Sequence, residues 1–166
     1  MARVGIALGS NLGDRLSNIR AAVEELRQIS APGAPLLEGS VWQTEPKLCP
    51  PGSPMFLNTV VEIVYEDEPF TLLEATKAIE KRLGRTTVAE RNAPRIIDVD
   101  LLYFGNRIID TEELELPHPR ISERRFVLQP LAEIRPDLTL PGQRADIATL
   151  LAGLKSDEAP LVRHEG

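Results

Sequence analysis

The 166-residue sequence predicts an α+β fold, and two observations support this prediction. Four stretches are rich in β-branched, aliphatic or aromatic residues, as strands are, and they cover residues 4–10, 36–44, 56–65 and 94–105. Two further stretches, 13–29 and 71–84, repeat apolar residues at the spacing of amphipathic helices. The order strand, helix, strand, strand, helix, strand is typical of a ferredoxin-like βαββαβ antiparallel sheet with helices packed on it.

Local signals predict where both helices begin and end. Asn11 or Asp14 is the expected cap of the first helix, because short polar side chains accept hydrogen bonds from unpaired N–H groups. Thr71 and Glu74 form a capping-box pattern at the start of the second helix, and Gly84 is expected to end it.

The C-terminal part is predicted to be mainly helical. Residues 107–109 are expected to form a short strand, and residues 117–134 run from a loop into a helix capped by Ser122. Residues 144–154 form a last predicted helix, and the tail from about Lys155 is expected to be flexible. No repeat or shift in composition divides the chain, so residues 1–166 are interpreted as a single domain.

Composition and charge limit the classes of function. The net charge of −6 argues against a non-specific nucleic-acid binder, which is more often basic. No segment approaches the ~18 apolar residues of a membrane span, and the apolar run at the N-terminus is too short for a signal peptide. Cys49 is the only cysteine, which fits a reducing compartment. We therefore expect a cytoplasmic protein that binds neither nucleic acid nor membranes.

Two aspartates, Asp98 and Asp100, lie in the middle of the predicted strand 94–105. Side chains of a strand alternate between its faces, so both carboxylates are expected on one face, with Val99 and Leu101 on the other. Two such carboxylates repel each other unless positive charge lies between them, and hard oxygen ligands favour Mg²⁺ over zinc. The alternative is a pair of solvent-facing aspartates on an edge strand, or aspartates paired with arginine.

Three arginines precede the aspartate pair, and they favour the metal site over the two alternatives. Arg85, Arg91 and Arg95 lie in a polar irregular stretch, and the planar guanidinium group matches phosphate oxygens. Carboxylates that bind a metal beside several arginines are typical of phosphoryl transfer. No P-loop motif is present in the sequence.

Five sets of motifs then indicate a family. The sequence contains, in order, ALGSNLGDR (7–15), TEP (44–46), FLN (56–58), LGR with ERNAPRIIDVDLLYFG (83–85 and 90–105), and LPHPR with RRFVLQPL (116–120 and 124–131). The same motifs follow in the same order in the 6-hydroxymethyl-7,8-dihydropterin pyrophosphokinases, which this sequence resembles from about Val4 to Leu131.

The resemblance implies transfer of the pyrophosphoryl group of ATP to the hydroxymethyl group of the pterin, with release of AMP, in folate biosynthesis. It implies two Mg²⁺ ions held by Asp98 and Asp100, and phosphate contacts from Arg85 and Arg95 as catalytic residues. Its expected partners are ATP and hydroxymethyldihydropterin, and a monomer is expected. The positions that match ATP-binding residues of the family are Glu80, Arg91, Leu101, His118 and Arg124.

The resemblance also implies a set of pterin-binding residues. Phe56 and Phe126 match the two rings that enclose the flat heterocycle. Asn58 and Thr44 match residues that hydrogen-bond its polar edge, and Gly9 lies beneath it. Taken singly, each phenylalanine is also compatible with a place in the core.

Some positions depart from the family pattern, and other functions compete with it. The departures are Thr87 and Asn92 in the arginine-rich stretch, and Glu113 and Glu115 near the expected nucleotide. The competing functions are a pterin- or nucleotide-binding module without turnover and a metal-dependent nuclease. We also expect residues 45–55 and 86–94 to be mobile without ligand and to become ordered when both substrates bind.

Overall fold

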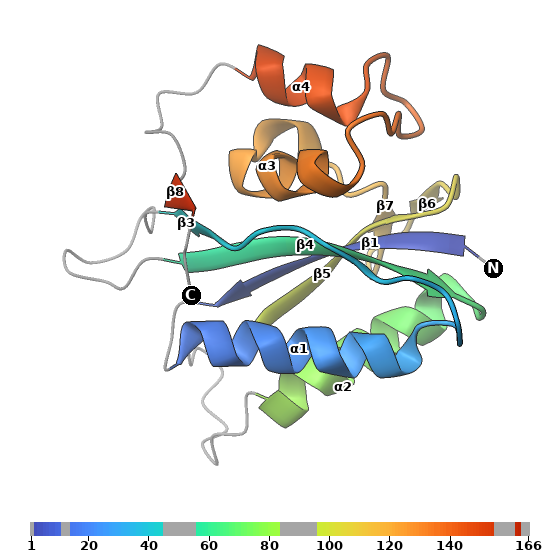
Figure 1. Ribbon diagram of the computed structural model, residues 1–166. Coiled ribbons are helices and arrows are strands. Elements are labelled where there is room, and N and C mark those ends of the chain that lie inside the picture. Colours follow the sequence, from blue (N-terminus) through green and yellow to red (C-terminus); the bar gives the residue numbers. More distant parts are fainter. Residues whose placement is uncertain (1, 11–13, 45–55, 84–95, 155–161, 164–166) are drawn as a thin grey trace.

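The protein is described here by a computed structural model, which covers residues 2–10, 14–44, 56–83, 96–154 and 162–163. A central sheet separates two layers of helices, with α1 and α2 on one face and α3 and α4 on the other (Figure 1). The helices are α1 (Arg15–Ile29), α2 (Pro69–Leu83), the 3₁₀ turn η1 (Ile121–Glu123), α3 (Arg125–Ile134) and α4 (Ile147–Gly153). None of the described helices is long and apolar enough to span a membrane.

The sheet is antiparallel throughout the described residues, with the strand order β5-β1-β4-β3-β8, and β2 also pairs with β4. Its strands are β1 (Ala2–Ser10), β2 (Leu37–Glu38), β3 (Trp42–Thr44), β4 (Phe56–Tyr65), β5 (Asp98–Phe104) and β8 (Val162–Arg163). A separate hairpin pairs β6 (Ile109–Asp110) with β7 (Glu115–Leu116). The predicted α+β class with an antiparallel sheet is therefore confirmed.

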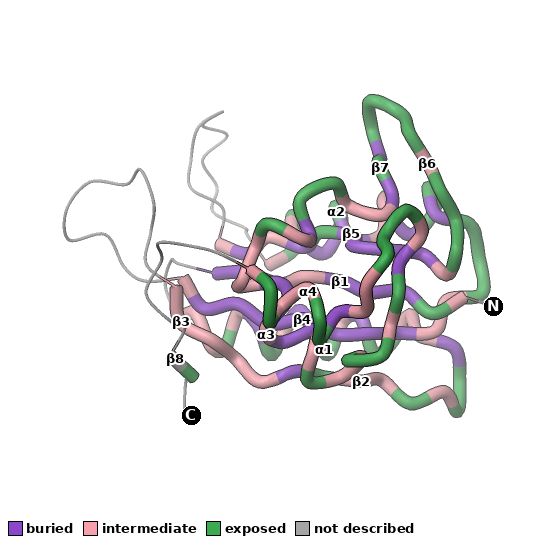
Figure 2. The backbone as a smooth tube through the Cα atoms, turned by 90° about the horizontal axis from the view of Figure 1, so that it is seen from above, coloured by how far each residue is buried: buried purple, intermediate pink, exposed green. Residues whose placement is uncertain are grey.

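The two faces of the sheet bury different residues because side chains alternate along each strand. In β1, Val4, Ile6 and Leu8 belong to the apolar core against α1 and α2. Ala7 instead packs against the second core, which lies between the sheet and the helices α3 and α4. This core contains Val60 of β4. Figure 2 shows β1, β4 and β5 largely buried in the middle of the molecule.

A bulge in β5 directs two large side chains to the α3 face. Ile6 pairs with Leu101, whereas the preceding Gly5 pairs with Tyr103, so one extra residue of β5 lies between these pairs. The ring of Tyr103 occupies the space above Gly5, where an added Cβ would lie 2.1 Å from Cε2 of the ring. This close approach requires glycine at residue 5.

The Tyr103 hydroxyl donates a hydrogen bond of 2.8 Å to Glu62, a carboxylate that is fully buried. Arg135 and Arg3 donate to the same carboxylate at 2.8 and 3.3 Å, so its charge is compensated. Burial, followed by the charge of Glu62, raises the pKa of Tyr103 above its ordinary value, and the tyrosine stays protonated.

The predicted strand 36–44 is interrupted in the structure, which corrects the sequence prediction. It forms β2 and β3, and the residues between them pass directly beneath α3. A Cβ on Gly39 would lie 2.9 Å from the carbonyl oxygen of Pro130. Ser40 then bonds the Glu133 carboxylate through both its N–H and its hydroxyl. Gly39 still donates from its N–H to the carbonyl of Val60 on β4, but the segment also contacts α3 here, and regular strand pairing resumes at Trp42.

Two predicted helix starts are wrong. Helix α2 begins at Pro69, so Thr71 and Glu74 lie inside it and form no capping box. Proline is favoured at the first helical position because its φ is already helical. Helix α3 has Arg124 as its N-cap residue, without a capping side chain, because Ser122 lies in the η1 turn that precedes it.

Other local predictions have mixed outcomes. Asp14 caps α1 by accepting from the N–H of Ser17, as predicted. The short strand expected at 107–109 is β6, displaced to Ile109–Asp110, and its partner β7 was not predicted. In the tail, Val162 and Arg163 pair with β3 in a short strand that was not predicted, and the expected flexibility of the tail stays a prediction. Gly84 and the remaining tail residues lie outside the described ranges.

Candidate active site

One row of paired residues crosses the sheet and contains three of the predicted site residues. Asp98 of β5 pairs with Gly9 of β1, Gly9 pairs with Asn58 of β4, and Asn58 pairs with Trp42 of β3. Residues paired across neighbouring strands point to the same face. That face is the α3 face, because Val60, two residues beyond Asn58, packs with the α3 core. With strands ~4.8 Å apart, the Cα atoms of Asp98 and Asn58 are about 10 Å apart.

The Asn58 side chain is buried and its orientation is fixed by two neighbours. Its Nδ2 donates a hydrogen bond of 2.8 Å to Oγ1 of Thr44. Its Oδ1 lies over Gly9, where an added Cβ would be 2.9 Å away. The glycine thus leaves room for the amide, and the amide presents its polar edge on this face of the sheet. The structure therefore brings Gly9, Asn58 and Thr44 into contact, and the family motifs predict a role in pterin binding for all three residues.

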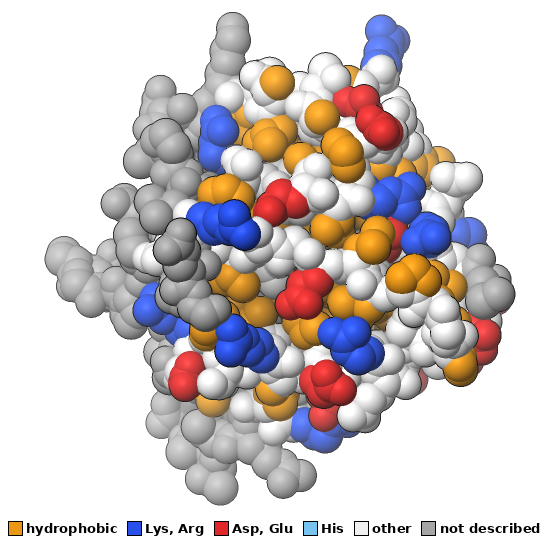
Figure 3. Space-filling model, viewed as in Figure 1, with side chains coloured by type: hydrophobic (Ala, Val, Ile, Leu, Met, Phe, Trp, Pro, Cys, Tyr) orange, Lys and Arg blue, Asp and Glu red, His pale blue; other side chains and the backbone are white. Residues whose placement is uncertain are grey.

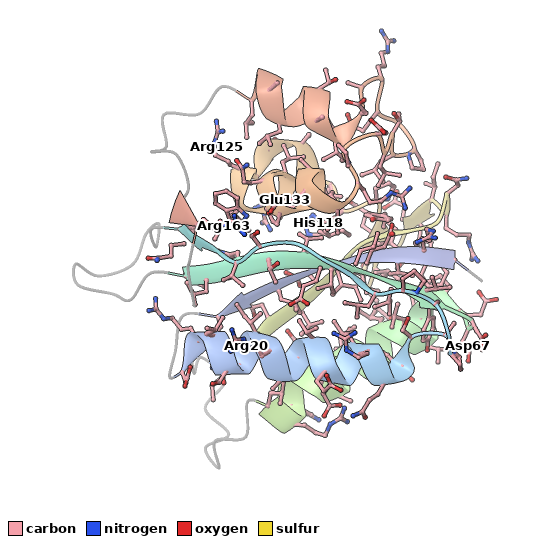
Figure 4. The ribbon with its side chains drawn as sticks, in the orientation of Figure 1. Arg20, Asp67, His118, Arg125, Glu133 and Arg163 are labelled. Carbon is pink, nitrogen blue, oxygen red and sulfur yellow. The ribbon has the colours of Figure 1, made fainter. Side chains whose placement is uncertain are left out.

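Two phenylalanines lie near the same end of the sheet. Phe56 of β4 pairs with Thr44, two residues along the strand from Asn58 and therefore on the same face, and its side chain is half-buried. Phe126 is the second residue of α3, and the Arg124 guanidinium lies 5.5 Å from the centre of its ring. In Figure 4, the first residue of α3, Arg125, lies at the same end of the molecule as Arg163, which pairs with Trp42. The two aromatic side chains thus belong to opposite layers, sheet and helix.

The aspartates lie on the α3 face as their spacing predicts, because Val99 and Leu101 are buried in the opposite core. Asp98 is half-buried and Asp100 is exposed, so solvent reaches the pair. Strand β5 is at the edge of the sheet that the described strands form. Among the described residues, no group of three or more His, Cys, Asp or Glu side chains is arranged to hold a metal. Any ion at this pair therefore needs further ligands.

His118 connects the aspartates to the basic residues before α3. Its N–H donates to the carbonyl of Leu102 at 2.7 Å, and its Nδ1 accepts from the N–H of Arg120 at 3.2 Å. Burial lowers the pKa of His118, the Arg124 charge lowers it further, and the Asp100 charge acts in the opposite direction. The ring is neutral at pH 7, and because Nδ1 accepts a hydrogen bond, Nε2 holds the proton as a donor.

The comparison with known proteins assigns these motifs to one family. Residues 5–136 match the model of the family described as 7,8-dihydro-6-hydroxymethylpterin-pyrophosphokinase, or HPPK. The chain belongs to this family. A pyrophosphokinase of this kind from Bacillus subtilis is 47% identical over 129 residues, which are 78% of this chain and 75% of that protein. A relative from Methylorubrum extorquens is 41% identical over 144 residues, covering 86% of this chain and 89% of that protein.

Longer proteins contain the same HPPK unit. The folic acid synthesis protein fol1 of Pneumocystis carinii is 39% identical over 146 residues, and the chain spans only 19% of its length. A Plasmodium falciparum HPPK-DHPS crystal structure superposes with a TM-score of 0.70 at 13% identity, over 91% of this chain and 44% of that chain. The family and enzyme class predicted from the sequence are confirmed by these matches, and the structural likeness confirms the ferredoxin-like fold.

Two of the residues predicted to bind ATP have structural contacts in this HPPK. The Glu80 carboxylate on α2 accepts a hydrogen bond of 3.0 Å from the N–H of Val99, between the two aspartates. Leu101 is buried, and it belongs to the core against α1 and α2, on the face of β5 opposite to Asp100. Both residues thus hold β5 in place, whatever else they contact.

Several predicted residues lie outside the described ranges. These are Arg85, Arg91 and Arg95, the departures Thr87 and Asn92, and the two segments expected to close over the substrates, 45–55 and 86–94. The predicted roles of these arginines and the predicted mobility stay predictions. The other two departures are described: Glu113 and Glu115 are both exposed.

Sequence reasoning missed residues that support the site. Ser10 is buried at the end of β1, and its hydroxyl donates a hydrogen bond of 2.6 Å to the carbonyl of Ile96, two residues before Asp98. Trp42 donates from Nε1 to Glu133 of α3 at 2.8 Å. The available signal for Trp42 was its spacing, because it lies two residues before Thr44 on the same strand and therefore faces the same side.

Proposed function

We propose that the α3 face of the sheet, at the end where Asp98, Gly9 and Asn58 form one row, is the active site of this HPPK. There it transfers the pyrophosphoryl group of ATP to 6-hydroxymethyl-7,8-dihydropterin in folate biosynthesis. The observation on which this assignment rests is the cross-strand row itself. It unites an acidic residue for a metal–nucleotide complex with the buried amide beside Thr44. Residues that are far apart in the sequence thus meet on one surface.

The pterin is assigned to the side of the row formed by β3, β4 and the start of α3. The Asn58 amide, held by Thr44, is both donor and acceptor, which suits the alternating donors and acceptors of a pterin edge. Gly9 adds no side chain beneath the flat ring. Phe56 and Phe126 approach from the sheet and from the helix, and aromatic faces stack on such a heterocycle.

The nucleotide is assigned to the side of the row formed by β5 and the segment before α3. Neutral His118 donates from Nε2, and Arg124 adds a positive charge near His118. The backbone of Leu101 on β5, the edge strand among the described residues, is assigned to the base, and Glu80 holds that strand through Val99. Arg91, and Arg85 and Arg95 as the catalytic arginines, are proposed to contact the nucleotide, as in the family motif they match.

Magnesium fits the residues that are present. Asp98 and Asp100 offer hard oxygen donors on one face, and Asp100 is accessible to solvent. Mg²⁺ commonly binds through one or two carboxylates together with substrate phosphates and water, which agrees with the lack of a larger ligand cluster among the described residues. Two ions bound there would neutralise phosphate charge as the hydroxymethyl oxygen attacks the β-phosphorus and AMP leaves.

The remaining expectations about this HPPK are also proposals. We propose a cytoplasmic monomer that binds no nucleic acid and consists of one domain over residues 1–166. The net charge of −6 supports the absence of nucleic-acid binding. On the face shown in Figure 3, basic and acidic side chains are interspersed among the described residues, which supports it further. Light scattering should give a mass near 18.3 kDa in solution.

The test of the proposed site is an assay for AMP. The wild-type protein is expected to form AMP from ATP only when hydroxymethyldihydropterin and Mg²⁺ are both added. Phe126→Ala should raise the pterin Kd about tenfold, because it removes a stacking face as well as buried area. The Kd of an ATP analogue should change less than twofold. Equal weakening of both ligands would assign Phe126 to the general core and overturn the pterin side of this proposal.

A further inference from the structure

Glu133, near the end of α3, connects that helix to the strand segment that leads into the proposed site. Its carboxylate accepts three hydrogen bonds from two residues of this segment. The N–H of Ser40 donates at 3.1 Å, the hydroxyl of Ser40 at 2.7 Å, and Nε1 of Trp42 at 2.8 Å. Figure 4 shows Glu133 on the α3 side of the sheet, as is His118. One side chain of α3 thus bonds both Ser40 and the first residue of β3.

The position of Glu133 on α3 determines what this connection controls. Phe126 and Glu133 are seven residues apart, so they lie on the same face of the helix. With a rise of 1.5 Å per residue, the two Cα atoms are about 10 Å apart along the axis. A contact at Glu133 therefore fixes both the rotation of α3 and its height above the sheet at Phe126.

The position of Trp42 determines the other end of the connection. Trp42 pairs directly with Asn58, and it lies two residues before Thr44 on the same strand. Asn58 in turn donates to Thr44. The indole that contacts α3 is thus an immediate neighbour of both residues proposed to bind the polar edge of the pterin.

The strand segment already contacts α3 at Gly39, three residues before Trp42. The ideal Cβ of Gly39 would lie 2.9 Å from the carbonyl oxygen of Pro130 and 3.0 Å from its Cβ. Neither backbone has room to approach further there. The Trp42–Glu133 bond is the next contact of the strand segment with α3 beyond Gly39 and Ser40.

We propose that Trp42 and Glu133 are positioning residues for the pterin, because their hydrogen bond sets the distance between Phe126 and the Asn58–Thr44 pair. The two residues act through those neighbours. This inference rests on the proposed assignment of Phe126, Asn58 and Thr44 to the pterin. A flat ring stacks only where the opposing surfaces are about one ring thickness from it, so a small movement of α3 weakens pterin binding and leaves the nucleotide side unaffected.

The first test compares two substitutions of Glu133. Glu133→Ala removes all three hydrogen bonds and is expected to raise the KM for the pterin about tenfold, with the KM for ATP changed less than twofold. Glu133→Gln keeps Oε1 for both N–H donors, and its amide group donates to the hydroxyl of Ser40, so it is expected to restore the pterin KM to within about threefold. A residue that only stabilises the fold would produce no such difference between the two substrates.

The second test uses the other end of the bond. Trp42→Phe removes the Nε1 donor and keeps an aromatic side chain, so it should raise the pterin KM by an amount similar to Glu133→Ala. The double variant should be no worse than either single variant, because both break the same bond. Trp42 is the only tryptophan in the chain, so its fluorescence reports this contact directly. Its emission should shift in Glu133→Ala and remain close to wild type in Glu133→Gln.

Two controls separate the possible failures. Glu25→Ala removes a carboxylate that bonds Arg82 at 2.5 Å on the opposite side of the sheet, and it should leave both KM values unchanged. Phe126→Ala tests the underlying assignment of the pterin site. If Phe126→Ala weakens pterin binding while Glu133→Ala and Trp42→Phe do not, the positioning inference is wrong and the site proposal stands. If Phe126→Ala leaves pterin binding unchanged, the site proposal itself is wrong.

Discussion

The two faces of β1 differ sharply, although the same nine residues form both. Toward α1 and α2, the strand presents Val4, Ile6 and Leu8, which are at most 1% exposed in a continuous apolar core. Toward α3, it presents Gly5, Ala7 and Gly9. Gly5 leaves space for the ring of Tyr103, and Gly9 leaves space for the amide of Asn58. One face therefore provides stability through burial, and the other provides room for polar groups.

The α3 face is itself divided along its length. At one end, the polar cluster around Glu62 is saturated by Tyr103, Arg135 and Arg3, so its groups are already paired within the protein. At the other end, Asp98 and Asp100 lie together on an edge strand and reach solvent. The polar residues around Glu62 thus form a cluster within the protein, whereas Asp98 and Asp100 place two carboxylates where a ligand can reach them.

The largest expected effect concerns the aspartates. Replacing both Asp98 and Asp100 with asparagine keeps side-chain size and removes the charge that would hold Mg²⁺. The rate of AMP formation should fall by more than about a hundredfold, since electrostatic stabilisation in the transition state is lost. The melting temperature should stay near the wild-type value, because Asp100 is exposed and neither side chain belongs to the apolar core. Near-normal AMP formation by the double variant would refute the metal assignment.

The second prediction concerns the opposite face of β1. Leu8 is 1% exposed in the core against α1 and α2. Leu8→Ala should lower the free energy of unfolding by about 2–5 kcal/mol, as is usual for a buried leucine. Urea denaturation measures this loss, and the pterin Kd of the folded fraction should be unchanged. A large change in the pterin Kd with little loss of stability would reverse the roles that we assign to the two faces.

The adjacent residue gives the matched third prediction. A Cβ at Gly9 would lie 2.9 Å from Oδ1 of Asn58, so Gly9→Ala should displace the amide from its position beside Thr44. The pterin Kd should rise about tenfold, equivalent to about 1.4 kcal/mol. Calorimetric titration of this variant beside Leu8→Ala compares two neighbouring residues on opposite faces. The comparison fails if Leu8→Ala and Gly9→Ala affect pterin binding equally.

The smallest expected effect is that of Thr44→Val. Valine has the shape of threonine without the hydroxyl, so Nδ2 of Asn58 loses its 2.8 Å acceptor while the packing is kept. A hydrogen bond of this kind contributes about 0.5–1.5 kcal/mol, so the pterin Kd should rise severalfold. ATP binding, measured with a non-hydrolysable analogue, serves as the internal control. An equal change in the affinity for this analogue would argue against a specific role in orienting Asn58.

Much of the fold follows from local patterns in the sequence. The alternation in β1 and the apolar spacing in α1 and α2 predict these elements because the residues that specify them are close in the sequence. The break between β2 and β3 was not predictable in this way, since it depends on contacts of Gly39 with Pro130 and of Ser40 with Glu133. Strand β8 was missed for the same reason, because its partner β3 lies far away in the chain.

The candidate site shows the same limit. The spacing of Asp98 and Asp100 predicts that they share a face, and the motifs predict which residues belong to the site. Neither predicts that Asp98, Gly9 and Asn58 form a single row, because the register between strands depends on the whole sheet. The contact between Trp42 and Glu133 was likewise invisible, since it joins a strand to a helix whose packing the sequence does not specify.

The central claim is that the α3 face of the sheet binds the pterin and the α1–α2 face does not. The most direct measurement is an NMR experiment that detects magnetisation transfer from bound hydroxymethylpterin to protein side chains, recorded with a non-hydrolysable ATP analogue and Mg²⁺. The assignment predicts contacts from the pterin to Phe126 and Asn58, and none to Leu8 or Val61, which lie in the opposite core. Contacts to Leu8 or Val61, with none to Phe126 or Asn58, would contradict it.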